Sequence, residues 1–148
     1  MGGFSNLLKG FKKKCAVDRP RSAVVGEWGE EHSARFLSDG GYRILARNVR
    51  PDRRDEIDIV ARYENTLVFV EVKTRADESF GSPITAVDRS KRHALNRAAA
   101  AYLKKAGYPD LFYRFDVIEV VGTPEGGEPL IRHIENAFPF ERRYRFPV

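Results

Sequence analysis

Alternating apolar and polar residues mark two short runs near the middle of the chain. Residues 56–61 read Glu-Ile-Asp-Ile-Val-Ala, and residues 67–73 read Leu-Val-Phe-Val-Glu-Val-Lys. Both runs are rich in β-branched residues and follow the period of two that is typical of strands. The polar pair Glu64-Asn65 lies between them. The pattern therefore predicts two strands joined as a hairpin.

Glycine and proline divide the rest of the chain into further elements. Gly40 and Gly41 follow a helical run and suit its end, because glycine adopts the left-handed conformation that closes many helices. Gly107 and Pro109 end a second, longer run with a helical apolar stripe. The predicted order is α-β-β-β-α-β-(β), with helices at 27–37 and 84–105 and strands at 42–50, 56–61, 67–73, 113–121 and, at the edge, 130–134. This order predicts an α/β fold.

Periodicity also assigns particular side chains to the core or to one face. In the first helix, the predicted core contacts are Trp28, Phe36 and Leu37. Strict alternation in the first strand places Tyr42, Ile44, Ala46 and Asn48 on one face.

Composition is that of a globular domain. The chain has 148 residues, of which 42% are hydrophobic and 32% charged, which suits a single domain with a core of its own. One cysteine, Cys15, excludes an internal disulfide framework and a cysteine-based zinc site. No apolar run is long enough to span a membrane, so no integral membrane segment is predicted. These features fit a bacterial cytoplasm.

Charge is distributed unevenly along the chain. The formal net charge is +5, and residues 1–22 account for all of it with six basic side chains and one acid. The chain is therefore divided into a basic N-terminal tail at 1–22, a domain at 23–138 and a C-terminal extension at 139–148. Phe4, Leu7, Leu8 and Phe11 have helical spacing, so the tail is either a short amphipathic helix that touches a partner or a frayed end.

Carboxylates gather in the predicted hairpin. Glu56 and Asp58 share one face of its first strand, and Glu71 and Lys73 share one face of its second. If the strands pair, these groups converge on a spot that suits a divalent cation with oxygen ligands. The alternative is an ordinary surface ion pair between a carboxylate and a lysine, which contributes little. Acids within apolar, core-like runs favour the metal site, because such burial is costly unless the groups are paired or functional.

Several motifs together resemble a known family. Asp58 followed at hairpin distance by Glu71-Val72-Lys73 resembles the PD-(D/E)xK nuclease superfamily. Over roughly residues 24–138, the chain is similar to the YraN-like family of uncharacterised bacterial proteins. The residues that carry this similarity are Gly26-Glu27-Trp28-Gly29-Glu30, Asn48, Asp55-Glu56-Ile57-Asp58, Phe69-Val70-Glu71-Val72-Lys73-Thr74-Arg75, Gly81, Lys91 and Arg114-Phe115-Asp116. Asp55 departs from the family, which usually has glycine there, and adds a negative charge near the site.

The resemblance implies a restriction-endonuclease-like core, with a mixed central sheet flanked by helices, and a Mg²⁺ or Mn²⁺ site. By this similarity Asp58 and Glu71 are metal ligands, the Val72 carbonyl is a third, and Lys73 is the catalytic ammonium. Glu30 on the first helix matches a glutamate that contributes in several branches of the superfamily.

The sequence leaves two possible roles open for several other polar residues. Glu56 either binds a second metal through water or forms a salt bridge with Arg53 or Arg54. Arg114 and Asp116 flank Phe115 on one strand face and are predicted to form an internal ion pair. The candidate nucleic-acid contacts, whose alternative is a solvated helix face for any single one, are Arg75, Arg89, Lys91 and Arg92.

The leading function hypothesis is a metal-dependent endonuclease that hydrolyses phosphodiester bonds in DNA, in branched or single-stranded forms. The alternative is a nucleic-acid-binding module with the same fold and no turnover. A third hypothesis is a scaffold or membrane-peripheral adaptor that works through residues 1–22. A domain of this size has little room for its own specificity module, so a homodimer or a partner protein is also expected.

Overall fold

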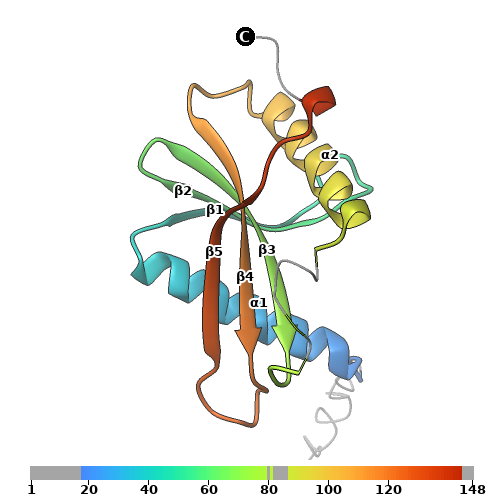
Figure 1. Cartoon of the computed structure of the whole chain (residues 1–148), viewed down its shortest axis with the longest axis vertical. Coiled ribbons are helices and arrows are strands. Elements are labelled where there is room, and N and C mark those ends of the chain that lie inside the picture. The colour runs from blue at the N-terminus through green and yellow to red at the C-terminus, as the bar shows by residue number, and fades with distance from the viewer. Residues whose placement is uncertain (1–17, 80, 82–86, 145–148) are drawn as a thin grey trace, which may run out of the picture.

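A single sheet of five strands forms the centre of the fold. The computed structural model describes residues 18–79, 81 and 87–144. The strand order is β1-β2-β3-β4-β5, and only β3 and β4 are parallel (Figure 1). The sheet is therefore mixed, and the predicted α/β fold with a restriction-endonuclease-like arrangement is confirmed. The elements are α1 (Arg21–Asp39), β1 (Arg43–Val49), β2 (Ile57–Tyr63), β3 (Thr66–Arg75), α2 (Arg89–Lys105), β4 (Phe112–Val121), β5 (Leu130–Phe138) and the short 3₁₀ helix η2 (Arg142–Tyr144).

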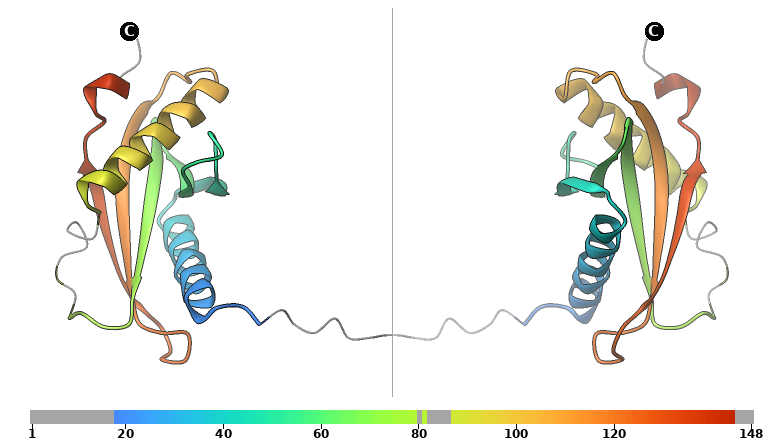
Figure 2. Two further views of the ribbon diagram at one scale, coloured as in Figure 1. Left: turned by 90° about the vertical axis from the view of Figure 1, so that its right-hand side faces the viewer. Right: turned by 90° about the vertical axis from the view of Figure 1, so that its left-hand side faces the viewer.

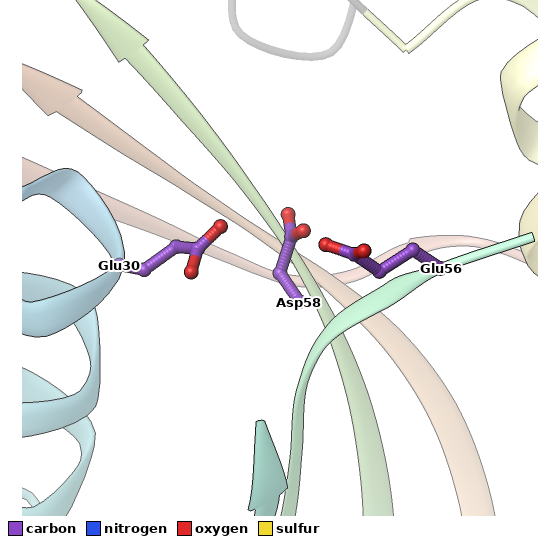
Figure 3. A group of neighbouring side chains, drawn as sticks. All are labelled: Glu30, Glu56 and Asp58. Carbon is purple, nitrogen blue, oxygen red and sulfur yellow. The ribbon is translucent and has the colours of Figure 1, made fainter. Parts of the chain in front are cut away.

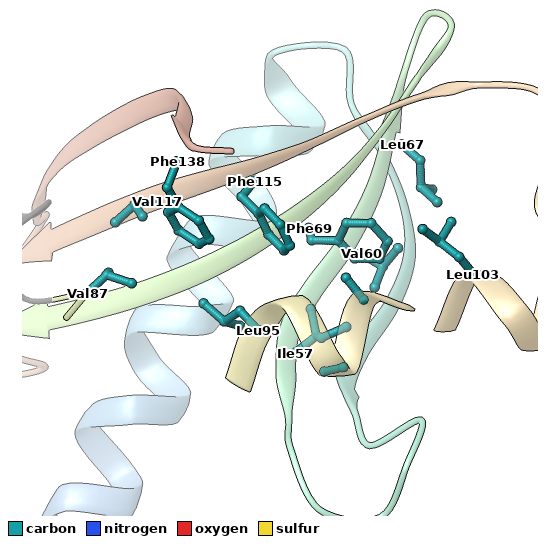
Figure 4. Packing of buried hydrophobic residues seen from close by; sticks show 12 residues of the cluster. Ile57, Val60, Leu67, Phe69, Val87, Leu95, Leu103, Phe115, Val117 and Phe138 are labelled. Carbon is teal, nitrogen blue, oxygen red and sulfur yellow. The ribbon is translucent and has the colours of Figure 1, made fainter. Parts of the chain in front are cut away.

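Two apolar clusters lie on opposite faces of the sheet. Phe69 and Phe115 belong to the cluster that contains Leu95 and Leu103 of α2 (Figure 4). Strand neighbours of Phe69 face the other way and pack with α1, in a cluster of Ala34, Leu37, Tyr42, Ile59, Ala61, Val68, Val70, Ile118 and Val120. Figure 2 shows the strands nearly edge-on with α1 along one side. Both faces of β3 and β4 are thus covered, which explains the continuous apolar run Leu67–Val70 in β3.

Strict alternation fails in β1. Tyr42 and Ile44 pack in the α1 cluster, as predicted, but Ala46 packs against the α2 cluster. The register of β1 against β2 shifts between Ile44 and Ala46, which is a β-bulge. Because a bulge inserts one residue without a partner, the side chains after it change faces. The prediction that these side chains share one face is therefore wrong.

The helices begin at residues other than those predicted. α1 begins at Arg21, six residues earlier than predicted. α2 begins at Arg89, because the Asp88 carboxylate accepts a hydrogen bond from the Lys91 amide (2.8 Å) and caps the helix there. The predicted helical residues 84–86 lie outside the described residues. Phe36, a predicted core contact, is 40% exposed.

The predicted hairpin of β2 and β3 forms, but its two strands part at their far end. Their ladder runs from Tyr63–Thr66 to Ile59–Val70 and ends there, whereas β3 continues beside β4 as far as Arg75. Ile57 packs in the α2 cluster and Ile59 in the α1 cluster, so β2 turns as it leaves β3. Asp58 lies between them, at the point where the strands part.

A close approach of α1 to β3 fixes the distance between the helix and the sheet near Asp58. Gly29 is buried, and a Cβ built on it would lie 1.9 Å from Thr74 Oγ1, 3.1 Å from Thr74 Cβ and 3.2 Å from Thr74 Cγ2. Only glycine allows helix and strand to meet so closely, because no rotation of the threonine would clear all three atoms. The next residue is Glu30, which therefore lies close to the sheet.

We predict that Gly29→Ala destabilises the protein by about 1–3 kcal/mol, because the added methyl overpacks the contact with Thr74. Urea unfolding of the purified variant measures this. Gly26→Ala is the matched control, because a Cβ there would meet nothing within 4 Å. The control is expected to gain about 0.5–1 kcal/mol from its higher helix propensity. Equal effects in the two variants would contradict the close approach.

Candidate functional site

Three carboxylates from two elements and a turn converge where β2 and β3 part. Glu30 comes from α1, Asp58 from β2 and Glu56 from the residue before β2. Each offers a carboxylate oxygen, and these oxygens lie within 4.8 Å of one another (Figure 3). Three like charges at this separation repel one another unless a cation or a proton intervenes.

Asp58 is held by the backbone of the neighbouring strand. Its Oδ2 accepts a hydrogen bond from the Val72 amide (2.8 Å), in the place that β2 leaves vacant in the ladder. Burial, followed by the charges of Glu71 and Glu30, raises the pKa of Asp58 to about 8, although the Val72 amide and Lys91 act in the opposite direction. The carboxyl group is therefore largely protonated at neutral pH when no cation is bound.

Glu71 is almost completely buried, and only one of its two carboxylate oxygens has partners among the described residues. Its side chain is 3% exposed. Oε1 lies 3.2 Å from Lys73 Nζ and 3.4 Å from Lys91 Nζ. Oε2 is buried and has no hydrogen-bond partner among the residues that the structure describes. Because such a group costs about 1–3 kcal/mol, or more when charged, this oxygen marks a place where a ligand is expected.

Glu30 is positioned by a residue whose role the sequence reasoning missed. Burial raises the pKa of Glu30 and a hydrogen bond with Asn48 lowers it, with a net upward shift. Asn48 has a left-handed backbone (φ 50°) at the end of β1. Asparagine tolerates this conformation better than most residues. An asparagine near the end of the predicted strand 42–50 was the signal for such a role.

Two further acids near the site have arginine partners. Glu56 pairs with Arg50 (3.0 Å), and not with Arg53 or Arg54 as the salt-bridge alternative held. Asp55, which stands where the family usually has glycine, accepts hydrogen bonds from Arg97 of α2 (3.0 and 3.2 Å). The extra charge at Asp55 is thus compensated.

A hollow of about 560 Å³ opens beside the carboxylates. Its wall combines the first half of α1 with the strand ends at the site: Arg21, Ser22, Val25, Gly26, Glu30, Asp58, Glu71, Val72 and Thr74. The predicted metal-site residues Asp58, Glu71 and Val72 therefore face one space together with Glu30. Glu56 approaches the same carboxylates from the other side (Figure 3).

The predicted nucleic-acid contacts are scattered. Lys91 lies at the site, beside Glu71. Arg75 is 3.8 Å from the buried Glu119 in an internal ion pair. Arg92 donates to the Val87 carbonyl (2.9 Å) and lies over the Phe138 ring. Arg89 lines a different hollow, next to η2. The structure thus brings only Lys91 of these four to the carboxylates.

The donor set fits a hard divalent cation. Carboxylate oxygens are the ligands that Mg²⁺ and Mn²⁺ prefer, and this site offers several of them with one left unpartnered. Two lysines touch only one oxygen of one carboxylate, so the local positive charge does not compensate the acids. A cation would remove both the repulsion and the unsatisfied oxygen.

A second buried carboxylate in the neighbouring strand gives a contrast. Asp116 of β4 is fully buried and accepts hydrogen bonds from Arg114, from the Asn136 amide and from His133 if that ring carries the Nε2 proton. Burial opposes ionisation, but His133 and Arg114 hold the pKa of Asp116 below its ordinary value. The predicted ion pair of Arg114 and Asp116 is confirmed. Asp116 forms a salt bridge with an internal cation, whereas Asp58 forms none with the residues that the structure describes.

A mixed sheet with helices packed on both faces and a buried acidic site at parting strands defines an α/β protein with a restriction-endonuclease-like arrangement. The model of the uncharacterised protein family UPF0102 matches residues 29–120. The chain belongs to this family, the YraN-like one that the motifs indicated.

Bacterial relatives match over most of their length. A UPF0102 protein of Symbiobacterium thermophilum is 48% identical over 117 residues, 79% of this chain and 98% of that protein. One from Pelobacter propionicus is 46% identical over 122 residues, 81% and 86% of the two chains. One from Nocardia farcinica is 45% identical over 115 residues, 78% and 89% of the two chains. Among the described residues, no helix is both long enough and apolar enough to cross a membrane.

We predict that Asp58→Asn stabilises the metal-free protein at pH 8 by at least about 1.4 kcal/mol, the worth of one pKa unit. The folded-state pKa of Asp58 lies above its unfolded value, so the native carboxyl binds a proton more tightly and its stability contribution falls as pH rises from about 4 to about 8. Asparagine keeps an oxygen for the Val72 amide and carries no charge. Urea unfolding in the presence of a chelator should show a smaller increase in the free energy of unfolding at pH 5 than at pH 8, relative to the wild type.

Asp116→Asn is the control for burial alone. It leaves Arg114 without its carboxylate, so a loss of about 3 kcal/mol is expected at neutral pH. Because the pKa of Asp116 is depressed, its contribution is present at neutral pH and declines as pH falls through the folded-state pKa. A loss of stability in both variants would show that Asp58 is a structural group like Asp116.

Proposed function

We propose that this chain is a metal-dependent nuclease that hydrolyses phosphodiester bonds in DNA, in branched or single-stranded forms, in the bacterial cytoplasm. The observation that carries the proposal is the pairing of the partly buried Asp58 with the buried Glu71, whose Oε2 has no partner among the described residues. A fold on its own does not establish an activity, so the proposal rests on this site.

Asp58 and Glu71 are the residues that would hold Mg²⁺ or Mn²⁺, with the Val72 carbonyl as a third ligand. When bound, such a cation lowers the pKa of a water molecule and neutralises charge on the phosphate. Glu30, whose pKa is raised, can accept a proton from water at the edge of the site. Glu56, partly neutralised by Arg50, adds negative charge beside Asp58 and Glu30 and would bind a second metal through water.

Lys73 is the proposed catalytic ammonium. Its Nζ lies beside Glu71 Oε1 (3.2 Å), and its side chain is 28% exposed, so the group is both fixed and open to solvent. An ammonium in this place orients the attacking water and stabilises the negative charge that develops on the phosphate oxygens. Because a domain of 148 residues has little room for its own specificity module, a homodimer or a partner protein is proposed to supply substrate selectivity.

Calorimetric titration of Mg²⁺ and Mn²⁺, together with cleavage of duplex, single-stranded and four-way-junction DNA, tests the proposal. Asp58→Ala should bind no cation and cleave nothing. Lys73→Ala should still bind the cation, and its cleavage rate should fall at least about 100-fold, because an electrostatic stabiliser is lost. Lys104→Ala, an exposed lysine in the last turn of α2, is the control and should match the wild type.

Each outcome separates the hypotheses. Wild-type-like cleavage by both site variants would reject the assignment of the site. Cation binding that depends on Asp58, without cleavage of any substrate, would favour the nucleic-acid-binding module. No cation binding, even with DNA present, would leave Glu71 and Lys73 as a structural ion pair.

A further inference from the structure

Among the described residues, the hollows on the two sides of the site differ in the positive charge that they offer to a phosphate. On the α1 side a hollow of about 640 Å³ contains Glu27, Glu30 and Glu31. The arginines there are already engaged, because Arg19 pairs with Glu27 and Arg47 pairs with Glu31. A polyanion on that side would meet carboxylates and compensated arginines, which is unfavourable.

The α2 side has the opposite character. A hollow of about 720 Å³ lies between the first turns of α2 and η2 and is lined by Arg89, Ser90, His93, Glu141, Arg142 and Arg143. Figure 1 shows η2 beside α2. Its single acid, Glu141, already lies 2.9 Å from Arg143 and 3.1 Å from His93. The hollow therefore has an excess of positive charge.

Two of its arginines are available for a ligand. Arg89 and Arg142 have no carboxylate partner among the residues that the structure describes. Arg142 is exposed, and the backbone around it is fixed, because the Glu141 amide donates to the Asn96 side chain (2.8 Å). Guanidinium groups bind phosphate through paired hydrogen bonds, and Ser90 adds a hydroxyl in the same space.

One helical turn connects this hollow with the acidic site. Lys91 follows Arg89 and Ser90 in the first turn of α2, and its Nζ lies 3.4 Å from Glu71 Oε1. Because residues two apart on a helix point in different directions, a strand with one phosphate in the hollow reaches Lys91 and the carboxylates by passing around this turn. Phosphate contacts of this kind fix the register of a nucleic acid without reading its sequence.

We propose that the hollow formed by Arg89, Ser90 and Arg142 is a phosphate anchor for a sugar–phosphate strand whose neighbouring phosphodiester lies at the site of Asp58 and Glu71. The inference rests on the proposed function, and it names the substrate class: a polynucleotide with at least one phosphate beyond the bond that is cut. A mononucleotide or a simple diester would not reach both places.

Binding of a single-stranded oligonucleotide of about twelve nucleotides, measured by fluorescence anisotropy in EDTA, tests the anchor independently of cleavage. Arg89→Ala and Arg142→Ala should each weaken binding about tenfold. Each should also reduce the slope of log affinity against log salt by about one. Arg35→Ala removes one exposed arginine of α1 and is the control, expected to bind as the wild type does. Equal losses in all three variants, unchanged binding in the two anchor variants, or no binding by the wild type would overturn the anchor.

Hydrolysis of bis(para-nitrophenyl) phosphate with Mn²⁺ separates the anchor from the chemistry. This diester has no second phosphate, so Arg89→Ala and Arg142→Ala should keep the wild-type rate on it while the KM for the oligonucleotide rises about tenfold. Loss of diester hydrolysis in these variants would overturn the anchor, because it would mean that the arginines maintain the site. No hydrolysis of either substrate by the wild type would count against the proposed function, and the binding data would still decide the anchor.

Discussion

The structure depends on one electrostatic constraint: the partly buried Asp58 and the buried Glu71 lie near each other, and the positive charge around them contacts only Glu71. Two lysines share one oxygen of Glu71, the Val72 amide serves one oxygen of Asp58, and Glu71 Oε2 has no partner among the described residues. In a medium of low polarity, such groups either take up a proton or need a cation. The raised pKa of Asp58 corresponds to the first outcome, in which the carboxyl group holds a proton. A bound divalent cation would be the second outcome.

The fold maintains the constraint through three separate contacts. The β2–β3 ladder ends at Ile59 and Val70, so that the Asp58 carboxylate takes the place of a strand partner. Gly29 allows α1 to pack against Thr74, which places the Glu30 carboxylate close to the sheet. The Asp88 cap starts α2 so that Lys91 reaches Glu71. Because each contact belongs to a different layer, the site is rigid only when the whole sheet and both helices are assembled, and such preorganisation is what an electrostatic catalyst requires.

The local sequence pattern predicted much of the fold and of the candidate site, and the predictions that were wrong have physical causes. Alternation and turn residues located the hairpin and the residues that meet in it, because period and punctuation are local properties. The bulge after Ile44 and the parting of β2 from β3 depend on packing across the sheet, which no single run of residues reveals. Salt-bridge partners also depend on the folded structure. The sequence analysis paired Glu56 with Arg53 or Arg54, but in the folded turn Glu56 pairs with Arg50. Asn48 was assigned to a strand face because its left-handed backbone is visible only in three dimensions.

Asp58 and Asp116 together show why the site is best understood as functional. Asp116 is fully buried and Asp58 is partly buried, and loss of solvent raises the pKa of both. Asp116 is compensated by Arg114 and His133, and its pKa is depressed. At Asp58 burial and the charges of Glu71 and Glu30 outweigh the effects of the Val72 amide and Lys91, and its pKa is raised. The chain can therefore satisfy a buried aspartate with its own side chains and does so one strand beyond β3. Leaving Asp58 uncompensated costs stability, and proteins carry such costs mainly where a ligand removes them. The shortage of positive charge at Asp58 is thus the argument for proposing that a cation from solution binds there.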